Sequence, residues 1–119
     1  MDMKIREVNE NKKHFISLLL LADEQENMVD RYLEKGTMYV LEDGDVKAEC
    51  VVTDEDNGIL EIKNIAVNPE NQRKGYGKAL IDFLASKYAD EYSVLHQLPR
   101  IRHQIQKNHR VIKAVALQM

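Results

Sequence analysis

The chain has 119 residues, which is enough for one domain with a hydrophobic core and too few for a second domain of ordinary size. Its 44% hydrophobic and 31% charged residues are typical of a globular protein, and no apolar run approaches the length of a membrane-spanning helix. A single cysteine, Cys50, excludes an internal disulfide, and its place within a strand pattern indicates a small buried side chain rather than a nucleophile. Because the N-terminus also differs from a secretory signal, we expect a cytoplasmic protein without a membrane partner.

The charge is distributed unevenly along the chain. All 20 acidic residues lie within 1–91, where 12 Lys and Arg leave a net charge of −8. Residues 92–119 carry five Lys and Arg and no acidic residue, which gives a net charge of +5. This change predicts that the C-terminal segment is under different constraints from the rest of the chain.

The first third of the chain predicts a strand followed by two helices. Residues 3–8 alternate apolar and polar side chains, as a strand does. Asn9 or Asn11 can cap the first helix, which carries apolar side chains at helical spacing. Asp23 with Glu26 three residues later is a capping-box pattern for the second helix.

A hairpin and a further strand follow. Gly36 is placed to end the second helix. The pair Asp43-Gly44 stands between strand patterns at 37–41 and 46–52, which predicts a tight hairpin. A polar turn then leads into a strand at 59–67, and 92–96 form a short later strand.

The strand at 59–67 changes phase within its length. Leu60 and Ile62 follow a period of two, and so do Ile65 and Val67, but the two pairs are out of phase by one residue. A β-bulge near Lys63-Asn64 would produce this slip, whereas in a strand buried on both faces the phase would carry no meaning.

A glycine-rich turn at Gln72–Gly77 separates that strand from a helical pattern at 79–84. Glycines let a backbone approach a ligand closely, and the first N–H groups of a helix lack partners within the helix. Together with Arg73, Lys74 and Lys78, this strand, turn and helix predict a site for a phosphate or pyrophosphate.

The turn and its neighbours resemble the GNAT superfamily of N-acetyltransferases over about residues 1–96. The sequence Gln72-Arg73-Lys74-Gly75-Tyr76-Gly77 matches the coenzyme A signature of that family, Gln/Arg-x-x-Gly-x-Gly/Ala. The resemblance implies an α/β fold with a mixed, mostly antiparallel sheet flanked by helices. It also implies transfer of an acetyl group from acetyl-CoA to a primary amine by direct attack, without a metal.

The resemblance assigns roles to individual residues. The pyrophosphate of acetyl-CoA would bind the backbone N–H groups from Arg73 to Lys78. The cofactor-binding residues of this segment would be Gln72, Arg73, Lys74, Gly75, Tyr76, Gly77 and Lys78. The pantetheine arm would pair with the strand backbone at Ile65, Ala66 and Val67, and the Ile65 N–H would stabilise the oxyanion.

Glu61 is the candidate base that removes the proton of the attacking amine. It stands four residues before Ile65, where some members of the family carry a glutamate base. The alternative is a strand glutamate that faces solvent, in the same phase as Lys63. Glu49 on the preceding strand is a second candidate.

The family pattern is not met after about residue 96. Residues 97–119 form a basic segment without Tyr, Phe, Gly or an acidic residue, so the acid that protonates the leaving thiolate is unassigned. The segment is read in three ways: as a divergent helix, as a basic helix for nucleic acid or anionic membrane, or as the result of truncation or a lost reading frame. A helix would place Ile101, Ile105, Ile112 and Val115 on one stripe.

Two other functions compete with the acetyltransferase. One is a CoA-binding remnant or interaction module with little catalysis, and the other is a nucleotide-phosphate-binding domain of another family. A nucleic-acid partner is disfavoured, because the positive tail accompanies a more negative main part and no aromatic residue interleaves with its cations. The amine acceptor is not identified, and a homodimer remains open.

Overall fold

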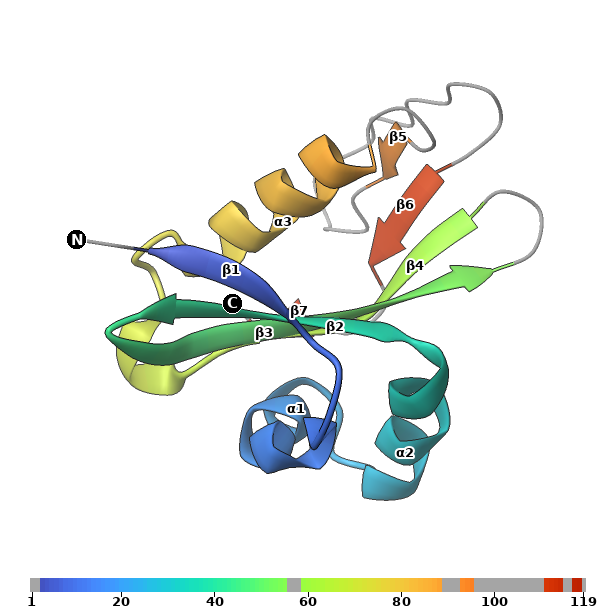
Figure 1. Ribbon diagram of the computed structural model, residues 1–119, viewed down its shortest axis with the longest axis horizontal. Coiled ribbons are helices and arrows are strands. Elements are labelled where there is room, and N and C mark those ends of the chain that lie inside the picture. Colours follow the sequence, from blue (N-terminus) through green and yellow to red (C-terminus); the bar gives the residue numbers. More distant parts are fainter. Residues whose placement is uncertain (1–2, 56–58, 89–92, 96–110, 115–116, 119) are drawn as a thin grey trace.

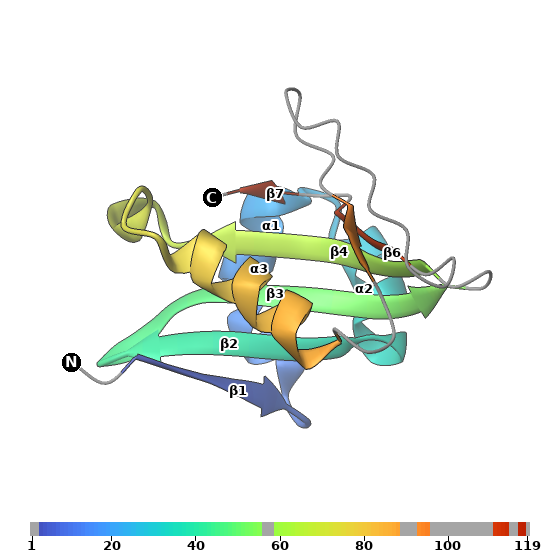
Figure 2. The same ribbon diagram turned by 90° about the horizontal axis from the view of Figure 1, so that it is seen from above.

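A single β-sheet with helices on both faces forms the centre of the computed structural model (Figure 1). Within its described residues, α1 (Ile16–Ala22) and α2 (Glu26–Lys35) lie on one face, and α3 (Tyr76–Lys87) lies on the other (Figure 2). The architecture is the mixed, mostly antiparallel α/β sheet that the sequence predicted. The structure describes residues 3–55, 59–88, 93–95, 111–114 and 117–118.

The first four strands pair in chain order, each antiparallel to the next. They are β1 (Lys4–Val8), β2 (Thr37–Asp43), β3 (Asp45–Glu55) and β4 (Ile59–Val67). β2 and β3 are joined at Gly44, whose φ of 87° suits a residue without a Cβ atom. The predicted hairpin is therefore confirmed.

Each face of the sheet has its own hydrophobic cluster. On the α3 face, Leu80 and Leu84 of the helix are 0% and 1% exposed, and burial of each leucine contributes about 1.5–3 kcal/mol. The strand residues of the same cluster are Tyr39, Leu41, Ala48, Cys50, Val52, Leu60, Ile62, Ile65 and Val67. The cluster beneath α1 and α2 consists of Val8, Leu19, Val29, Leu33, Met38, Val40 and Val51.

β4 contains a β-bulge at Lys63. Val51 of β3 pairs with Asn64 and Val52 pairs with Ile62, so the ladder passes over Lys63. Because of this extra residue, apolar side chains before and after the bulge all face α3 although they are out of phase. The bulge that the phase slip predicted is confirmed.

Three short strands pair beyond the free edge of β4: β5 (Ser93–Leu95), β6 (Val111–Ala114) and β7 (Leu117–Gln118). β6 pairs in parallel with the first half of β4, and β7 pairs in parallel with Ile65 and Ala66. The predicted strand at 92–96 is confirmed at 93–95, and its end residues lie outside the described part of the chain.

The helical alternative for the C-terminal segment is wrong at 111–114. Val111 and Ile112 are β-branched and suit a strand, and the edge of β4 offers N–H and C=O groups for pairing. Tertiary pairing thus overrides the helical spacing of the apolar residues. The other members of the predicted stripe, Ile101, Ile105 and Val115, lie outside the described residues, and the boundary at residue 96 stays a prediction.

The two helix starts differ from the predicted caps. Asn11 precedes a 3-10 turn, η1 (Lys12–Phe15), with a left-handed φ of 54°, and its side chain makes no capping hydrogen bond. α2 begins after Gln25 rather than after Asp23. The carboxylate of Asp23 accepts a hydrogen bond from the Gln25 N–H (3.1 Å), a local turn that competes with a helix cap. Gly36 ends α2 as predicted.

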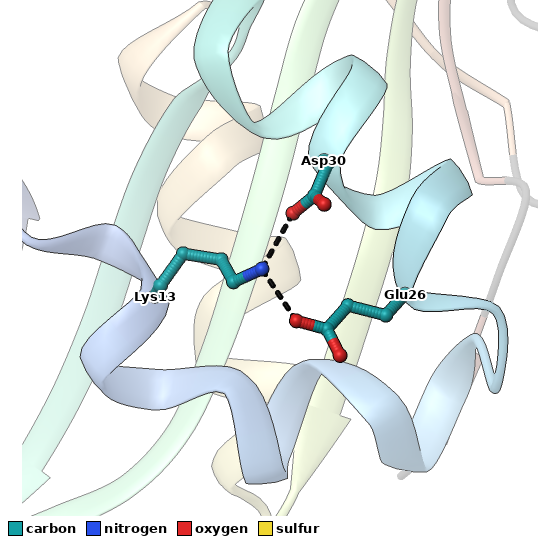
Figure 3. A network of polar contacts seen from close by, with 3 residues as sticks. All are labelled: Lys13, Glu26 and Asp30. Carbon is teal, nitrogen blue, oxygen red and sulfur yellow. Dashed lines mark hydrogen bonds and ion pairs between the residues drawn. The ribbon is translucent and has the colours of Figure 1, made fainter.

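An exposed ion-pair network joins η1 to α2. The Lys13 Nζ lies 2.7 Å from an oxygen of Asp30 and 2.5 Å from an oxygen of Glu26 (Figure 3). These hydrogen bonds raise the pKa of Lys13, and the bond to Asp30 has the largest effect. Exposed pairs add little to stability, so we assign to the network the local role of holding η1 against α2.

Candidate functional site

The predicted phosphate turn is one continuous structure between β4 and α3. After β4 the chain passes through a 3-10 turn, η2 (Pro69–Asn71). The Gln72 Nε2 then donates a hydrogen bond to the Val67 carbonyl oxygen (3.1 Å), which fixes the turn to the end of β4. Arg73 and Gly75 both have positive φ, 69° and 90°. A positive φ is unusual for arginine, and such residues are frequent where a backbone is shaped around a ligand.

The N-terminus of α3 is open at this turn. Gly75 is the N-cap residue and has no side chain with which to cap the helix, and a Cβ atom there would meet nothing within 4 Å. The first helical N–H groups, at the positive end of the helix dipole, are therefore left without a side-chain cap. Arg73 and Lys74 are exposed beside them, and Lys78 forms an ion pair with Asp82 (2.8 Å).

Tyr76 connects this turn to the β2–β3 hairpin. Its hydroxyl donates a hydrogen bond to an oxygen of Asp43 (2.7 Å), and this bond raises the pKa of Tyr76. Its ring packs against the hydrophobic cluster on the α3 face. The contacts of Tyr76 hold the turn in place, while Gly77 is buried in the first turn of α3.

Ile65, Ala66 and Val67 lie at the end of β4, directly before the turn. All three are almost fully buried, and Ile65 and Val67 pack toward α3. On one side β4 pairs with β3, and on the other side Ile65 and Ala66 pair with β7. The chain itself therefore pairs with the edge that the family resemblance assigned to the pantetheine arm.

Glu61 lies on β4 before the bulge, on the face toward α1 and α2. Its side chain is 15% exposed and forms an ion pair with Lys63. Lys63 is also 3.9 Å from Glu55. The candidate base is thus partly buried and shares its cation with a second carboxylate. Glu61 is therefore neither a fully buried base nor a strand glutamate that simply faces solvent, the two alternatives that the sequence left open.

A buried polar cluster on the same face was only partly anticipated. Asn64 Nδ2 donates hydrogen bonds to the Leu19 carbonyl oxygen (2.9 Å) and to the Tyr32 hydroxyl oxygen (3.0 Å). The Tyr32 hydroxyl in turn donates to Asp23 (3.2 Å). Burial is the main cause that raises the pKa of Tyr32 to about 12.

Glu49 lies beside this cluster and is 0% exposed. Burial raises the pKa of Glu49 well above its usual range. The sequence named Glu49 as a second candidate base but did not single out Asn64, Tyr32 or Asp23. The bulge could have indicated Asn64, because it puts Lys63 and Asn64 on the same face.

The described residues also include Cys50, the single cysteine of the chain. Cys50 is fully buried, as predicted, and burial followed by the charge of Glu49 raises the pKa of its thiol. Among the described residues, no group of three or more His, Cys, Asp or Glu side chains is placed to hold a metal ion. In the same part of the chain, no helix is long and apolar enough to cross a membrane.

Comparison with known proteins identifies the family. The Acetyltransferase (GNAT) domain matches residues 34–114, which include β4, the glycine turn and α3. The chain belongs to the GNAT family. A relative from Bacillus subtilis, the uncharacterized N-acetyltransferase YvbK, is 39% identical over 80 residues. That alignment covers 66% of this chain and 52% of the relative, so the chain spans about half the length of the curated relative it matches.

Solved GNAT structures share the fold. An acetyltransferase from Bacillus subtilis in complex with CoA has a TM-score of 0.69 and 34% identity, and a GNAT acetyltransferase from Elizabethkingia anophelis with acetyl-CoA bound has a TM-score of 0.69 and 29% identity. An IAA acetyltransferase from Bacillus cereus matches with a TM-score of 0.69 and 31% identity. Each match covers 75% of this chain and 59% of the other chain.

Proposed function

We propose that the protein is an N-acetyltransferase that transfers an acetyl group from acetyl-CoA to a primary amine. One observation carries this proposal: in a chain of the GNAT family, the open N-terminus of α3 follows a bulged β4 through a turn with two left-handed residues. We also expect a cytoplasmic location, because the single cysteine is buried and unpaired.

The residues of the turn fit the pyrophosphate of acetyl-CoA. The backbone N–H groups from Arg73 to Lys78 would bind its oxygens, and the exposed side chains of Arg73 and Lys74 would add charge. The open space at Gly75 allows the close approach that such binding requires. Bound acetyl-CoA would supply the acetyl group as a thioester.

The residues of β4 would assist the transfer. The Ile65 N–H would donate a hydrogen bond to the oxyanion, a contribution of about 2.7–4 kcal/mol for one such donor. Glu61 would accept a proton from the attacking amine. The amine nitrogen would form its bond to the acetyl carbon, the carbon–sulfur bond would break, and the thiolate would leave with a proton from a group not yet assigned.

This proposal places a condition on β7. If the pantetheine arm pairs with Ile65, Ala66 and Val67, the pairing of Leu117 and Gln118 with β4 must give way. The pairing involves only two residues of β7, and a hydrogen bond contributes about 0.5–1.5 kcal/mol net. Exchange of this segment for the arm is therefore energetically accessible.

The same pairing favours a second candidate function. A chain whose own strand remains on the edge of β4, and which spans about half of its curated relative, could be a CoA-binding remnant or interaction module with little or no catalysis. In that case the turn at Gln72–Lys78 would still bind the pyrophosphate.

The two functions are separated by binding and turnover of the same ligand. Isothermal titration with acetyl-CoA measures binding, and release of the CoA thiol with a panel of amines measures transfer. Binding with turnover supports the acetyltransferase, and binding without turnover supports the remnant. If acetyl-CoA does not bind at all, both proposals fail.

The turn itself is tested by a charge reversal at exposed positions. The double variant Arg73→Glu, Lys74→Glu should bind CoA at least about 100-fold more weakly, because each change replaces attraction to the pyrophosphate by repulsion. Lys87→Glu is a matched control, since Lys87 is exposed in the last turn of α3, at the far end of the helix. An equal loss in the control would indicate a general charge effect instead of a site.

A further inference from the structure

The face of the sheet that α1 and α2 cover contains buried polar atoms without partners. Among the described residues these are both carboxyl oxygens of Glu49 and the Oδ1 of Asn64. Both side chains belong to residues that are 0% exposed. A buried polar group without a hydrogen bond is uncommon and destabilises a fold, so the three atoms require a partner that the described residues do not supply.

The three atoms belong to adjacent strands and the same face. Glu49 of β3 pairs with Ala66 of β4, and Val51 pairs with Asn64. Glu49 and Asn64 are therefore diagonal neighbours across the ladder, at a Cα separation of about 7–8 Å that long side chains can bridge. Opposite Glu49, Ala66 carries only a methyl group.

Among the described residues, the side-chain donors of this cluster already have acceptors. The amide group of Asn64 donates to Leu19 and Tyr32, and the hydroxyl of Tyr32 donates to Asp23. What remains are acceptor atoms beside a carboxyl group. A group with several N–H donors and a positive charge would satisfy them, which describes an ammonium group.

The cluster is adjacent to the proposed reaction centre. Asn64 directly precedes Ile65, and the bulge turns Asn64 toward α1 and α2 while Ile65 faces α3. A groove of about 460 Å³ meets the cluster at Tyr32, and its charged lining consists of Arg31, Lys35, Lys63, Asp54 and Glu55. Tyr32 borders this groove and contacts Asn64 through its hydroxyl, so its side chain stands between the groove and the cluster.

We propose that Glu49 and Asn64 receive the amino group of the acceptor, a primary amine that enters past Tyr32. This proposal rests on the proposed acetyltransferase function and assigns an acceptor-binding role to residues outside the CoA turn. Burial favours the acid form of Glu49, so Glu49 releases its proton to solvent as the ammonium group binds. The ammonium group then donates to the resulting carboxylate and to the Oδ1 of Asn64. Glu61, already paired with Lys63, lies on the same face and remains the candidate base.

The first test observes the cluster directly and does not require turnover. CoA-saturated protein is titrated with n-propylamine near neutral pH while the side-chain NH₂ signals of Asn64 are followed by NMR. We expect these signals to shift in the wild type and not in Glu49→Leu. Tetramethylammonium, which has the charge without N–H donors, should leave them unchanged. Asn64 signals that do not respond to n-propylamine would overturn the proposal.

The second test separates binding from a structural role. Glu49→Leu should raise the Tm by roughly 4 °C or more, because it removes a buried carboxyl group without partners. The Kd for CoA should stay unchanged. With an amine that the wild type acetylates, the KM for the amine should rise at least about tenfold in Glu49→Gln, the loss of one charged contact. A lowered Tm with unaltered amine kinetics would show that Glu49 is structural.

The failures of the two proposals remain distinguishable. Glu42→Gln is the control, because it makes the same change on β2 at a residue that is paired with Arg6. It should leave the Kd for CoA and the KM for the amine unchanged. If the wild type does not bind CoA, the proposed function itself fails. If it binds CoA and acetylates an amine while the Glu49 variants behave like the wild type, only the acceptor site is wrong.

Discussion

The two faces of β4 are built from different kinds of side chain. The face toward α3 is apolar, and its four strand residues are at most 3% exposed. The face toward α1 and α2 carries Glu61, Lys63 and Asn64, with Glu49 beside them on β3. The bulge at Lys63 separates these roles, because it restores the apolar face after an extra polar residue has been added to the other. On β4, the apolar face belongs to the hydrophobic core, and the opposite face carries the polar groups to which we assign chemistry.

Adjacent residues on β4 give the most direct test of this difference, and the largest expected effect. Ile62→Ala should lower the free energy of unfolding by about 2–5 kcal/mol, because it opens a cavity beneath α3. Glu61→Ala, on the opposite face, should lower it by less than about 1 kcal/mol, as is usual for a partly exposed ion pair. Urea denaturation of the two variants measures both values. Similar losses would contradict the division between the faces.

Turnover should show the reverse order. Glu61→Gln should reduce kcat for amine acetylation by about 100-fold at neutral pH, since general-base catalysis contributes at least that factor. Binding of CoA should be unaffected, because Glu61 lies away from the turn at Gln72–Lys78. A steady-state assay at saturating acetyl-CoA gives kcat, and titration gives the Kd. An unchanged kcat would remove Glu61 as the base.

The pH dependence of stability should report on Glu49. Its pKa is raised in the folded state, so the folded protein binds more protons than the unfolded chain above the unfolded pKa of about 4.3. Stability should therefore decrease as the pH rises from that value toward the raised pKa, by up to about 1.4 kcal/mol per pH unit. Tyr32, with a pKa of about 12, does not titrate in this window.

Glu49→Gln removes this contribution and serves as the comparison. Denaturation curves at several pH values should show a steeper decrease for the wild type than for the variant. Parallel curves would mean that Glu49 has the same pKa in the folded and unfolded chains, and so would contradict its burial without a partner.

The smallest effect concerns the edge between the two faces. Successive N–H groups of a strand point to opposite sides, so one of the N–H groups of Leu117 and Gln118 points toward β4. Because proline has no N–H group, the double variant Leu117→Pro, Gln118→Pro removes that donor. CoA should then bind up to about tenfold more tightly, because its arm no longer competes with that pairing. Isothermal titration measures the change. Weaker binding would indicate that β7 supports the site.

The sequence predicted the apolar face of β4 better than the polar one. The period of two locates buried apolar residues whichever helix covers them, and the phase slip revealed the bulge at Lys63. Glu49 also follows a period of two, but a glutamate in alternation usually faces solvent, and its burial depends on where α1 and α2 pack. The contacts of Asn64 with Leu19 and Tyr32 join residues distant in sequence, which no local pattern encodes.

Local signals also misled where several of them compete. Asp23 has the spacing of a capping box, yet its carboxylate bonds the Gln25 N–H and the helix begins later. At Val111–Ala114 the apolar residues fit a helical stripe, but pairing with β4 makes them a strand. The glycine turn was the most predictable part of the candidate site, because its chemistry lies in consecutive residues. The CoA-binding roles assigned to that turn remain predictions.

The burial of Cys50 has a practical consequence for studying this protein. It is the only cysteine of the chain, and both its position in the core and its raised pKa keep the reactive thiolate scarce. A colorimetric thiol reagent added to the folded protein would therefore register only CoA set free by acetyl transfer. When the protein unfolds, the same reagent would label Cys50, so one absorbance trace could report product formation and loss of the native state in a single cuvette.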